Sequence, residues 1–142
     1  MIDCMIVGDS IAVGTAAFKQ ECVADYAKGG INTHQWNRMF KDANLSASMM
    51  IISLGTNDHQ YVNTRKELMA MRARVTANKV YWVLPYGNLY PKGGVKIETI
   101  QEIVKEIALI HGDTVLPIKR VQTDGIHPSW AGYKEIAREA KF

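Results

Sequence analysis

The chain has 142 residues, which suits one domain built around one hydrophobic core. Apolar residues make up 47% of it and charged residues 22%, ordinary values for a globular protein that exclude a disordered chain. The net charge is +3, and the lysines and arginines are scattered without the dense basic patch that a nucleic-acid-binding surface needs. No apolar run reaches the roughly 18 residues of a membrane-spanning helix.

Short apolar segments alternate with longer amphipathic ones along the chain. The apolar segments predict five strands, at residues 2–7, 22–26, 48–53, 79–84 and 114–116. The amphipathic segments predict five helices, at residues 10–20, 33–40, 64–77, 95–111 and 129–140. Residues 86–94 and 122–128 are predicted to be loops.

This alternation implies parallel strands joined by right-handed helical crossovers. The strands at 48–53 and 79–84 are almost continuously apolar, which is typical of a sheet covered by helices on both faces. We therefore expect one domain over residues 1–142, a three-layer α/β/α sandwich around a five-stranded parallel sheet. In such a fold the chemistry gathers in the loops beyond the carboxyl ends of the strands.

The two cysteines, Cys4 and Cys22, both lie in apolar segments. Our expectation is two buried free thiols, because free cysteine behaves as a small hydrophobic residue. A disulfide is the less favoured alternative, since sequence spacing alone cannot establish one. Neither cysteine has a polar base beside it in the sequence, which disfavours a cysteine nucleophile.

Three polar clusters directly follow predicted strands, at residues 8–10 (Gly-Asp-Ser), 55–58 (Gly-Thr-Asn-Asp) and 124–128 (Asp-Gly-Ile-His-Pro). Because parallel strands point the same way, these loops should meet at one edge of the sheet. Three distant segments can then form one site.

The residue types in these clusters suit nucleophilic catalysis. The hydroxyl of Ser10 is a poor nucleophile until a base takes its proton, and the imidazole of His127 can do so near neutral pH. Asp124 can accept the other ring N–H of His127, which fixes the tautomer and stabilises the imidazolium.

A tetrahedral intermediate also needs donors for its oxyanion. The candidates are the backbone N–H of Ser10 at a helix start, a backbone N–H at Gly30 and the side-chain amide of Asn57. Glycine suits the second position because it lets the backbone approach the substrate closely.

Together these motifs resemble the SGNH hydrolases of the GDSL lipase/esterase superfamily. The resemblance rests on residues 8–10, on Gly30, and on residues 55–58 and 124–127, in the family's order along nearly the whole chain. From average composition, the three longer motifs should occur together by chance in on the order of one chain in 10⁵.

The resemblance implies a flavodoxin-like sheet with strand order 2-1-3-4-5. It also implies a Ser10–His127–Asp124 triad, an oxyanion hole from Ser10, Gly30 and Asn57, and no metal or cofactor. The chain departs from the family pattern twice. Ile11 stands where a leucine often follows the serine, and no serine precedes the glycine of the second block, so that Gly29 is an alternative donor to Gly30.

Each residue also has a simpler explanation. Ser10 alone would be a helix N-cap, and Asn57 and Asp58 would be turn residues, Asp58 shaping its loop. Asp124 precedes a glycine in a common turn pair and would then be an ordinary turn residue.

The remaining histidines and aromatic residues carry weaker signals. Surface positions without metal-ligand spacing are expected for His34, His59 and His111, of which His59 adjoins the Asn57 loop and is a candidate substrate contact. Core or rim positions are expected for the aromatic residues Trp36, Tyr61, Trp82, Tyr86, Tyr90 and Trp130, with Trp82 in the core and the three tyrosines in loops at the active edge.

The sequence thus predicts a serine esterase that removes small acyl groups, such as acetyl, from an alcohol or carbohydrate. The alternatives are a thioesterase or lysophospholipase acting on longer acyl chains, and a non-catalytic carbohydrate-binding or assembly module that retains the fold. The expected partner is a small-molecule or carbohydrate ester, with no nucleic acid and no membrane span, and the oligomeric state is left open. No signal peptide is evident, which favours a cytoplasmic or virion-associated location.

Overall fold

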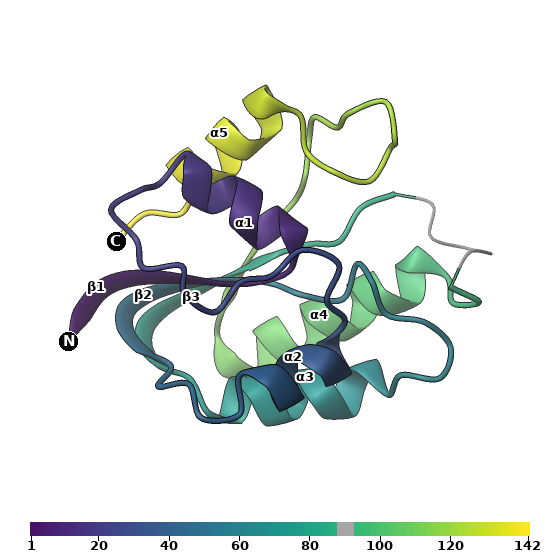
Figure 1. The fold of residues 1–142 in the computed structure, drawn as a ribbon, viewed down its shortest axis with the longest axis horizontal. Helices are drawn as coiled ribbons and strands as arrows, with labels where there is room; N and C mark the ends of the chain where they lie inside the picture. Colours follow the sequence, from purple (N-terminus) through teal and green to yellow (C-terminus); the bar gives the residue numbers. More distant parts are fainter. Residues whose placement is uncertain (88–92) are drawn as a thin grey trace.

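The computed structural model describes residues 1–87 and 93–142, and it has helices on both faces of a parallel sheet (Figure 1). In these two ranges the strands are β1 (Ile2–Gly8), β2 (Ser46–Ser53), β3 (Thr76–Val83) and β4 (Thr114–Leu116). The helices in the same ranges are α1 (Ser10–Ala17), α2 (Thr33–Met39), α3 (Thr64–Ala73), α4 (Ile97–His111) and α5 (Trp130–Glu139).

The strands lie in the order β1-β2-β3-β4 and every neighbouring pair is parallel. Helices α1 and α5 cover one face of the sheet, and α2, α3 and α4 cover the other (Figure 1). The predicted three-layer α/β/α arrangement is therefore confirmed.

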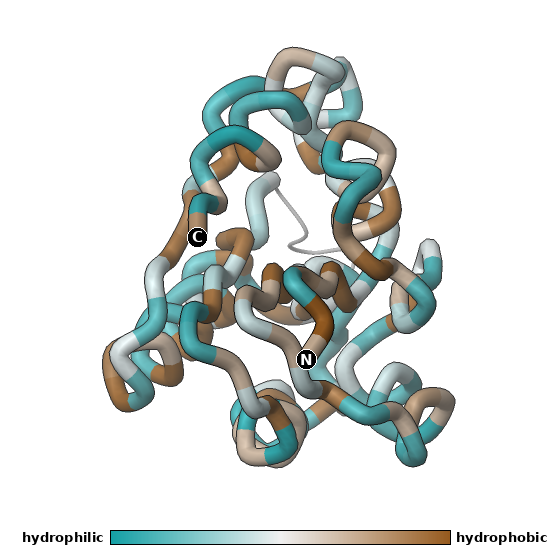
Figure 2. Tube along the Cα trace, turned by 90° about the vertical axis from the view of Figure 1, so that its left-hand side faces the viewer, coloured by the Kyte–Doolittle hydropathy of each residue, from teal (hydrophilic) through white to brown (hydrophobic). Residues whose placement is uncertain are grey.

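Two apolar layers separate the sheet from its helices. Alternate residues of the strands enter each layer, so that Val7, Met50 and Trp82 face α2 to α4 while Ile6 and Ile51 face α1 and α5. Hydrophilic and hydrophobic residues alternate along the helical turns in Figure 2, as expected of helices with one buried face. Among the described residues, no helix is both long enough and apolar enough to cross a membrane.

The second predicted strand, at residues 22–26, forms no regular strand. The segment instead makes two isolated parallel bridges to β1, Met5 with Val23 and Gly8 with Ala27. Between these bridges the segment advances by four residues and β1 by three. The extra residue interrupts the ladder, as in a β-bulge. The segment still occupies the edge beside β1 that strand order 2-1-3-4-5 assigns to it, and within the described residues the sheet has four strands instead of five.

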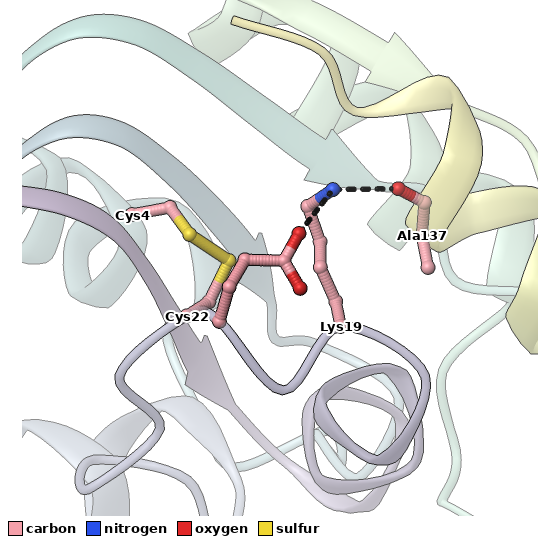
Figure 3. The surroundings of a disulfide bond; sticks show 5 residues. Cys4, Lys19, Cys22 and Ala137 are labelled. Atoms are coloured by element: carbon pink, nitrogen blue, oxygen red, sulfur yellow. Dashed lines mark hydrogen bonds and ion pairs between the residues drawn. A yellow bond between two sulfur atoms is a disulfide. The ribbon is translucent and has the colours of Figure 1, made fainter.

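The expectation of two free thiols is wrong, because Cys4 and Cys22 form a disulfide (Figure 3). The bridge segment brings their Cα atoms to 4.7 Å, and the N–H of Val23 donates to the carbonyl of Cys4 at 3.0 Å. This proximity arises only when the segment docks beside β1, so that the sequence spacing did not reveal it. In the surroundings of the disulfide, the ammonium of Lys19 donates to the carbonyl of Ala137 at 2.9 Å and connects the turn after α1 to α5 (Figure 3).

Candidate active site

The turn from β1 into α1 places Ser10 at the first position of the helix. Asp9, not Ser10, is the N-cap, since its side chain accepts from the N–H of Ile11 at 3.0 Å. The simpler interpretation of Ser10 as a helix cap therefore does not hold. The turn requires glycine at position 8, because its φ is +137° and a Cβ there would lie 1.8 Å from the carbonyl oxygen of Ser53.

The hydroxyl of Ser10 meets the imidazole of His127, although the two residues are 117 positions apart. Ser10 Oγ lies 2.9 Å from His127 Nε2, and His127 Nδ1 lies 2.7 Å from Asp124 Oδ2. The three side chains thus form one continuous chain of hydrogen bonds. The structure therefore brings together all three residues of the expected triad.

The ionisation of Asp124 determines which atoms donate and which accept in these hydrogen bonds. Its pKa is lowered to about 2, first by the backbone N–H of Ile126 and then by the side chain and N–H of His127. Asp124 is therefore a carboxylate that can only accept, so His127 Nδ1 carries the proton. In the neutral imidazole this leaves Nε2 free to accept the proton of the Ser10 hydroxyl.

The acid–base pair is held by its own turn rather than by the core. Asp124 Oδ1 accepts from the N–H groups of Ile126 and His127 at 2.9 and 3.0 Å. The N–H of Gln122 donates to the carbonyl of His127 at 2.8 Å and closes the turn. The turn lies at the surface, and the side chains of His127 and Asp124 are 34% and 41% exposed.

The expected oxyanion donors come from two further loops that contact each other. The amide of Asn57 donates one hydrogen bond to the carbonyl of Ile31 at 3.0 Å, which leaves its second N–H available. Among the described residues, the backbone N–H groups of Ser10, Gly29 and Gly30 donate to no backbone carbonyl.

The two glycines of the second block differ in their surroundings. Gly30 has a φ of +77°, and its neighbour Gly29 faces the nucleophile, since a Cβ on Gly29 would lie 3.8 Å from that of Ser10. Gly29 and Gly30 therefore both remain candidates.

A pocket of about 290 Å³ joins the loop of Asn57 to that of His127. The residues that line it are Thr56, Asn57, Asp58, His59, Gly93, Ile126 and His127. An acyl group bound at Ser10 would have this pocket beside it.

Asp58 has a larger role than that of a turn residue. Its buried carboxylate accepts from the N–H and hydroxyl of Thr33 at 2.8 and 2.7 Å, and from the hydroxyl of Thr64 at 2.6 Å. Burial raises its pKa, and the hydrogen bonds from Thr64 and Thr33 oppose that rise. Asp58 thereby fixes the Asn57 loop to the starts of α2 and α3. The sequence signal was a threonine at the start of each helix, and it was not recognised.

The other histidines lie where the sequence suggested. His59 lines the pocket, His34 pairs with Glu67 at 2.8 Å, and His111 contacts the carbonyl of Ile107 at 3.0 Å. Within residues 1–87 and 93–142, no group of three or more His, Cys, Asp or Glu side chains is arranged to hold a metal ion.

The aromatic residues divide between core and surface. Trp36 and Trp82 are fully buried, whereas Tyr61, Tyr86 and Trp130 are exposed. Tyr90 lies outside the described residues.

The order of the strands and the loops beyond their carboxyl ends define an α/β/α domain of the kind found in lipolytic proteins of the G-D-S-L family. A solved member from Veillonella parvula superposes with a TM-score of 0.68 at 18% identity, covering 99% of this chain and 96% of that one. The resemblance suggested by the motifs is thus confirmed at the level of the fold.

Two further solved structures share this fold and have named activities. The catalytic domain of a peptidoglycan O-acetyltransferase from Streptococcus pneumoniae has a TM-score of 0.69 at 16% identity, covering 96% of this chain and 88% of that one. An acetylxylan esterase from Geobacillus stearothermophilus has a TM-score of 0.63 at 15% identity, with coverages of 96% and 90%. No protein-family model matches the sequence, and no curated protein matches it either.

Proposed function

We propose that the protein is a serine esterase that acts through an acyl-enzyme. The observation that carries this proposal is the hydrogen-bonded chain from Ser10 through His127 to Asp124. A serine that only begins a helix does not need a histidine hydrogen-bonded to its hydroxyl. A histidine that only lies at the surface does not need an ionised carboxylate hydrogen-bonded to its ring. A nucleophile, a base and an orienting group in contact are what acyl transfer requires.

In this mechanism the Ser10 oxygen attacks the ester carbonyl while His127 Nε2 takes the hydroxyl proton. The oxyanion is held by the N–H of Ser10, the Asn57 amide and a backbone N–H of Gly30 or Gly29. The imidazolium then protonates the leaving alcohol, and the bond between the carbonyl carbon and the alcohol oxygen breaks. His127 next takes a proton from water, whose oxygen attacks the carbonyl carbon of the acyl-enzyme. The bond between that carbon and the Ser10 oxygen breaks, His127 returns the proton to the Ser10 oxygen, and the acid leaves.

The favoured substrate carries a small acyl group such as acetyl, on an alcohol or a carbohydrate. The pocket of about 290 Å³ is at the small end of the ~300–1,000 Å³ typical of ligand sites. Two of the similar structures are proteins named for acetyl groups, which supports the same choice.

Two measurements test the proposal. A fluorophosphonate probe should form a stoichiometric adduct at Ser10, and the Ser10→Ala variant should show neither adduct nor ester turnover while keeping its melting temperature. Turnover of p-nitrophenyl esters should be fastest for acetate and fall as the acyl chain lengthens. Absence of both adduct and turnover in the folded protein would favour the non-catalytic module. A rate maximum at about eight carbons or more would favour the long-chain alternative.

Transfer of the acyl group to an alcohol is a second candidate activity. The likeness to a peptidoglycan O-acetyltransferase domain favours it, because an acyl-enzyme can be attacked by a sugar hydroxyl in place of water. Supplying p-nitrophenyl acetate together with an oligosaccharide separates the two. A transferase yields acetylated sugar at the expense of acetate, whereas an esterase yields acetate alone.

The disulfide also bears on where the protein works. Bonds such as that between Cys4 and Cys22 persist in oxidising environments and are rare in the cytosol. We therefore propose an oxidising compartment, or a particle exposed to one, which disfavours the cytoplasmic alternative and is compatible with the virion-associated alternative that the sequence also suggested. When thiols are alkylated at lysis, the purified protein should carry no alkyl group on Cys4 or Cys22, and reduction should then release both thiols.

A further inference from the structure

Asp9 is a fully buried carboxyl beside the nucleophile for which the proposed reaction has no use. Its Oδ1 accepts from the N–H of Ile11 at 3.0 Å and from the hydroxyl of Ser53 at 3.1 Å. The backbone N–H of Asp9 in turn donates to the carbonyl of Ser53 at 2.9 Å. Asp9 and Ser53 are therefore joined by hydrogen bonds in both directions.

This pair connects two of the loops that build the site. Asp9 directly precedes Ser10, and Ser53 is the last residue of β2, from which the chain leads to Asn57. The two strand ends approach closely, since Gly8 pairs with Ser53 and has no room for a Cβ. This contact therefore lies between the segment that carries the Ser10 hydroxyl and the segment that carries the Asn57 amide.

The second carboxyl oxygen of Asp9 indicates that the residue serves as a hydrogen-bond acceptor and not as a charge. Among the described residues, Asp9 Oδ2 has no hydrogen-bond partner although it is buried. An ionised carboxylate with an unpartnered oxygen is costly in such surroundings, and burial raises the pKa of Asp9 to about 7. The contacts that are present need only a neutral acceptor at Oδ1.

We propose that Asp9 is a positioning residue, whose carboxyl oxygen acts as the hydrogen-bond acceptor that sets the distance between the Ser10 hydroxyl and the Asn57 amide. The inference rests on the proposed esterase function. Displacement of a reacting group by 1 Å can reduce a rate about 100-fold. Loss of the acceptor should accordingly reduce kcat, leaving KM little changed because the pocket itself is intact.

The test compares Asp9→Ala, Asp9→Asn and Ser53→Ala by kcat, KM, melting temperature and the rate of fluorophosphonate labelling. Asp9→Ala should lower kcat and the labelling rate together, by about 100-fold. Asp9→Asn keeps an acceptor oxygen and should remain within about 3-fold of wild type, and Ser53→Ala should fall between the two. The variant Asp9→Ala/Ser53→Ala should be no slower than Asp9→Ala alone, because both changes remove one shared contact.

Asp113→Asn is the matched control. The buried carboxylate of Asp113 accepts from the guanidinium of Arg72 at 2.8 and 2.9 Å and from the indole N–H of Trp82 at 2.9 Å, and it directly precedes β4, at the opposite end of the sheet from Ser10. Its replacement should lower the melting temperature and leave kcat unchanged.

Three results would overturn the inference. Wild-type kcat in folded Asp9→Ala would make Asp9 merely structural, and Asp9→Asn as slow as Asp9→Ala would mean that the charge is required. If Asp9→Ala does not fold, an unchanged kcat in Ser53→Ala would overturn the inference instead. Failure of the esterase proposal is seen separately, as wild-type protein without turnover or adduct.

Discussion

The two halves of the candidate site are held in different ways. On the nucleophile side, Val7, Asp9, Ile11 and Ala12 are fully buried around Ser10. On the acid–base side, Asp124 and His127 lie on a surface turn with a third or more of each side chain exposed. The nucleophile is thus fixed by strand register and core packing, and the base by hydrogen bonds within its own turn.

This difference teaches that stability and chemistry should respond separately to substitution. Changes to the buried residues around Ser10 disturb the core and should reduce stability. Changes in the acid–base turn should reduce activity and leave the fold intact, because few core contacts depend on it.

Asp124→Asn should give the largest effect, on activity alone. The amide keeps an acceptor for the turn but can donate to His127 Nδ1, which stabilises the tautomer that cannot take the Ser10 proton. In an analogous triad the same change costs about 10⁴-fold in kcat, and we expect a loss of that order with an unchanged melting temperature. Kinetics on p-nitrophenyl acetate and a thermal melt check both. A large fall in melting temperature with activity retained would contradict the expectation that changes in the acid–base turn affect activity and not stability.

Gly8→Ala should cause the largest loss of stability. The added Cβ would collide with the Ser53 carbonyl at a φ of +137°, at a cost above about 4 kcal/mol. Gly125→Ala is the matched change in the acid–base turn, where φ is +67° and a Cβ meets nothing within 4 Å, so that about 1–2 kcal/mol is expected. Urea unfolding of both variants measures the loss of unfolding free energy. Equal losses would show that the nucleophile side and the acid–base turn are held in the same way.

Reduction of the disulfide should destabilise the nucleophile side without stopping catalysis. Closing the loop between Cys4 and Cys22 should contribute about 2–4 kcal/mol, mainly through the unfolded chain. The N–H of Gly8 still donates to the carbonyl of Tyr26 at 3.1 Å, and we expect kcat to remain within about 3-fold because such backbone contacts keep the turn in place. Melts with and without reductant, beside the Cys4→Ala/Cys22→Ala variant, test this. Identical melting temperatures in oxidised and reduced protein would contradict it.

The smallest expected effect is a pH dependence of stability that comes from Asp9. Its pKa of about 7 in the folded protein exceeds the ordinary 3.8, so the folded state binds a proton that the unfolded state has lost. Its contribution to stability is therefore fully present below about pH 4 and is lost as the pH rises to about 7. Between pH 5 and 7 the change is on the order of 2 kcal/mol.

Asp9→Asn removes this titration. The melting temperature of the variant minus that of wild type should therefore be more positive at pH 8 than at pH 5. A difference independent of pH would show that Asp9 has an ordinary pKa.

The sequence alone determined the order of the elements, the parallel sheet between two helical layers, and the three loops at one sheet edge. It did so because strand and helix periodicity and the residues that follow each strand are local features of the chain. The same signals predicted that Ser10, His127 and Asp124 would meet, and the pair of Asp124 and His127 is itself local, lying within one turn.

The tertiary structure decided those features that need contact between segments far apart in the sequence. The segment after α1 docks beside β1 with one extra residue, and so it forms bridges and a disulfide where the sequence suggested a strand and two thiols. The contacts of Asp9 with Ser53, and of Asp58 with Thr33 and Thr64, join residues whose partners no local pattern names. A buried polar group must find a partner somewhere in the fold, and which one it finds is settled only when the strands and helices have packed.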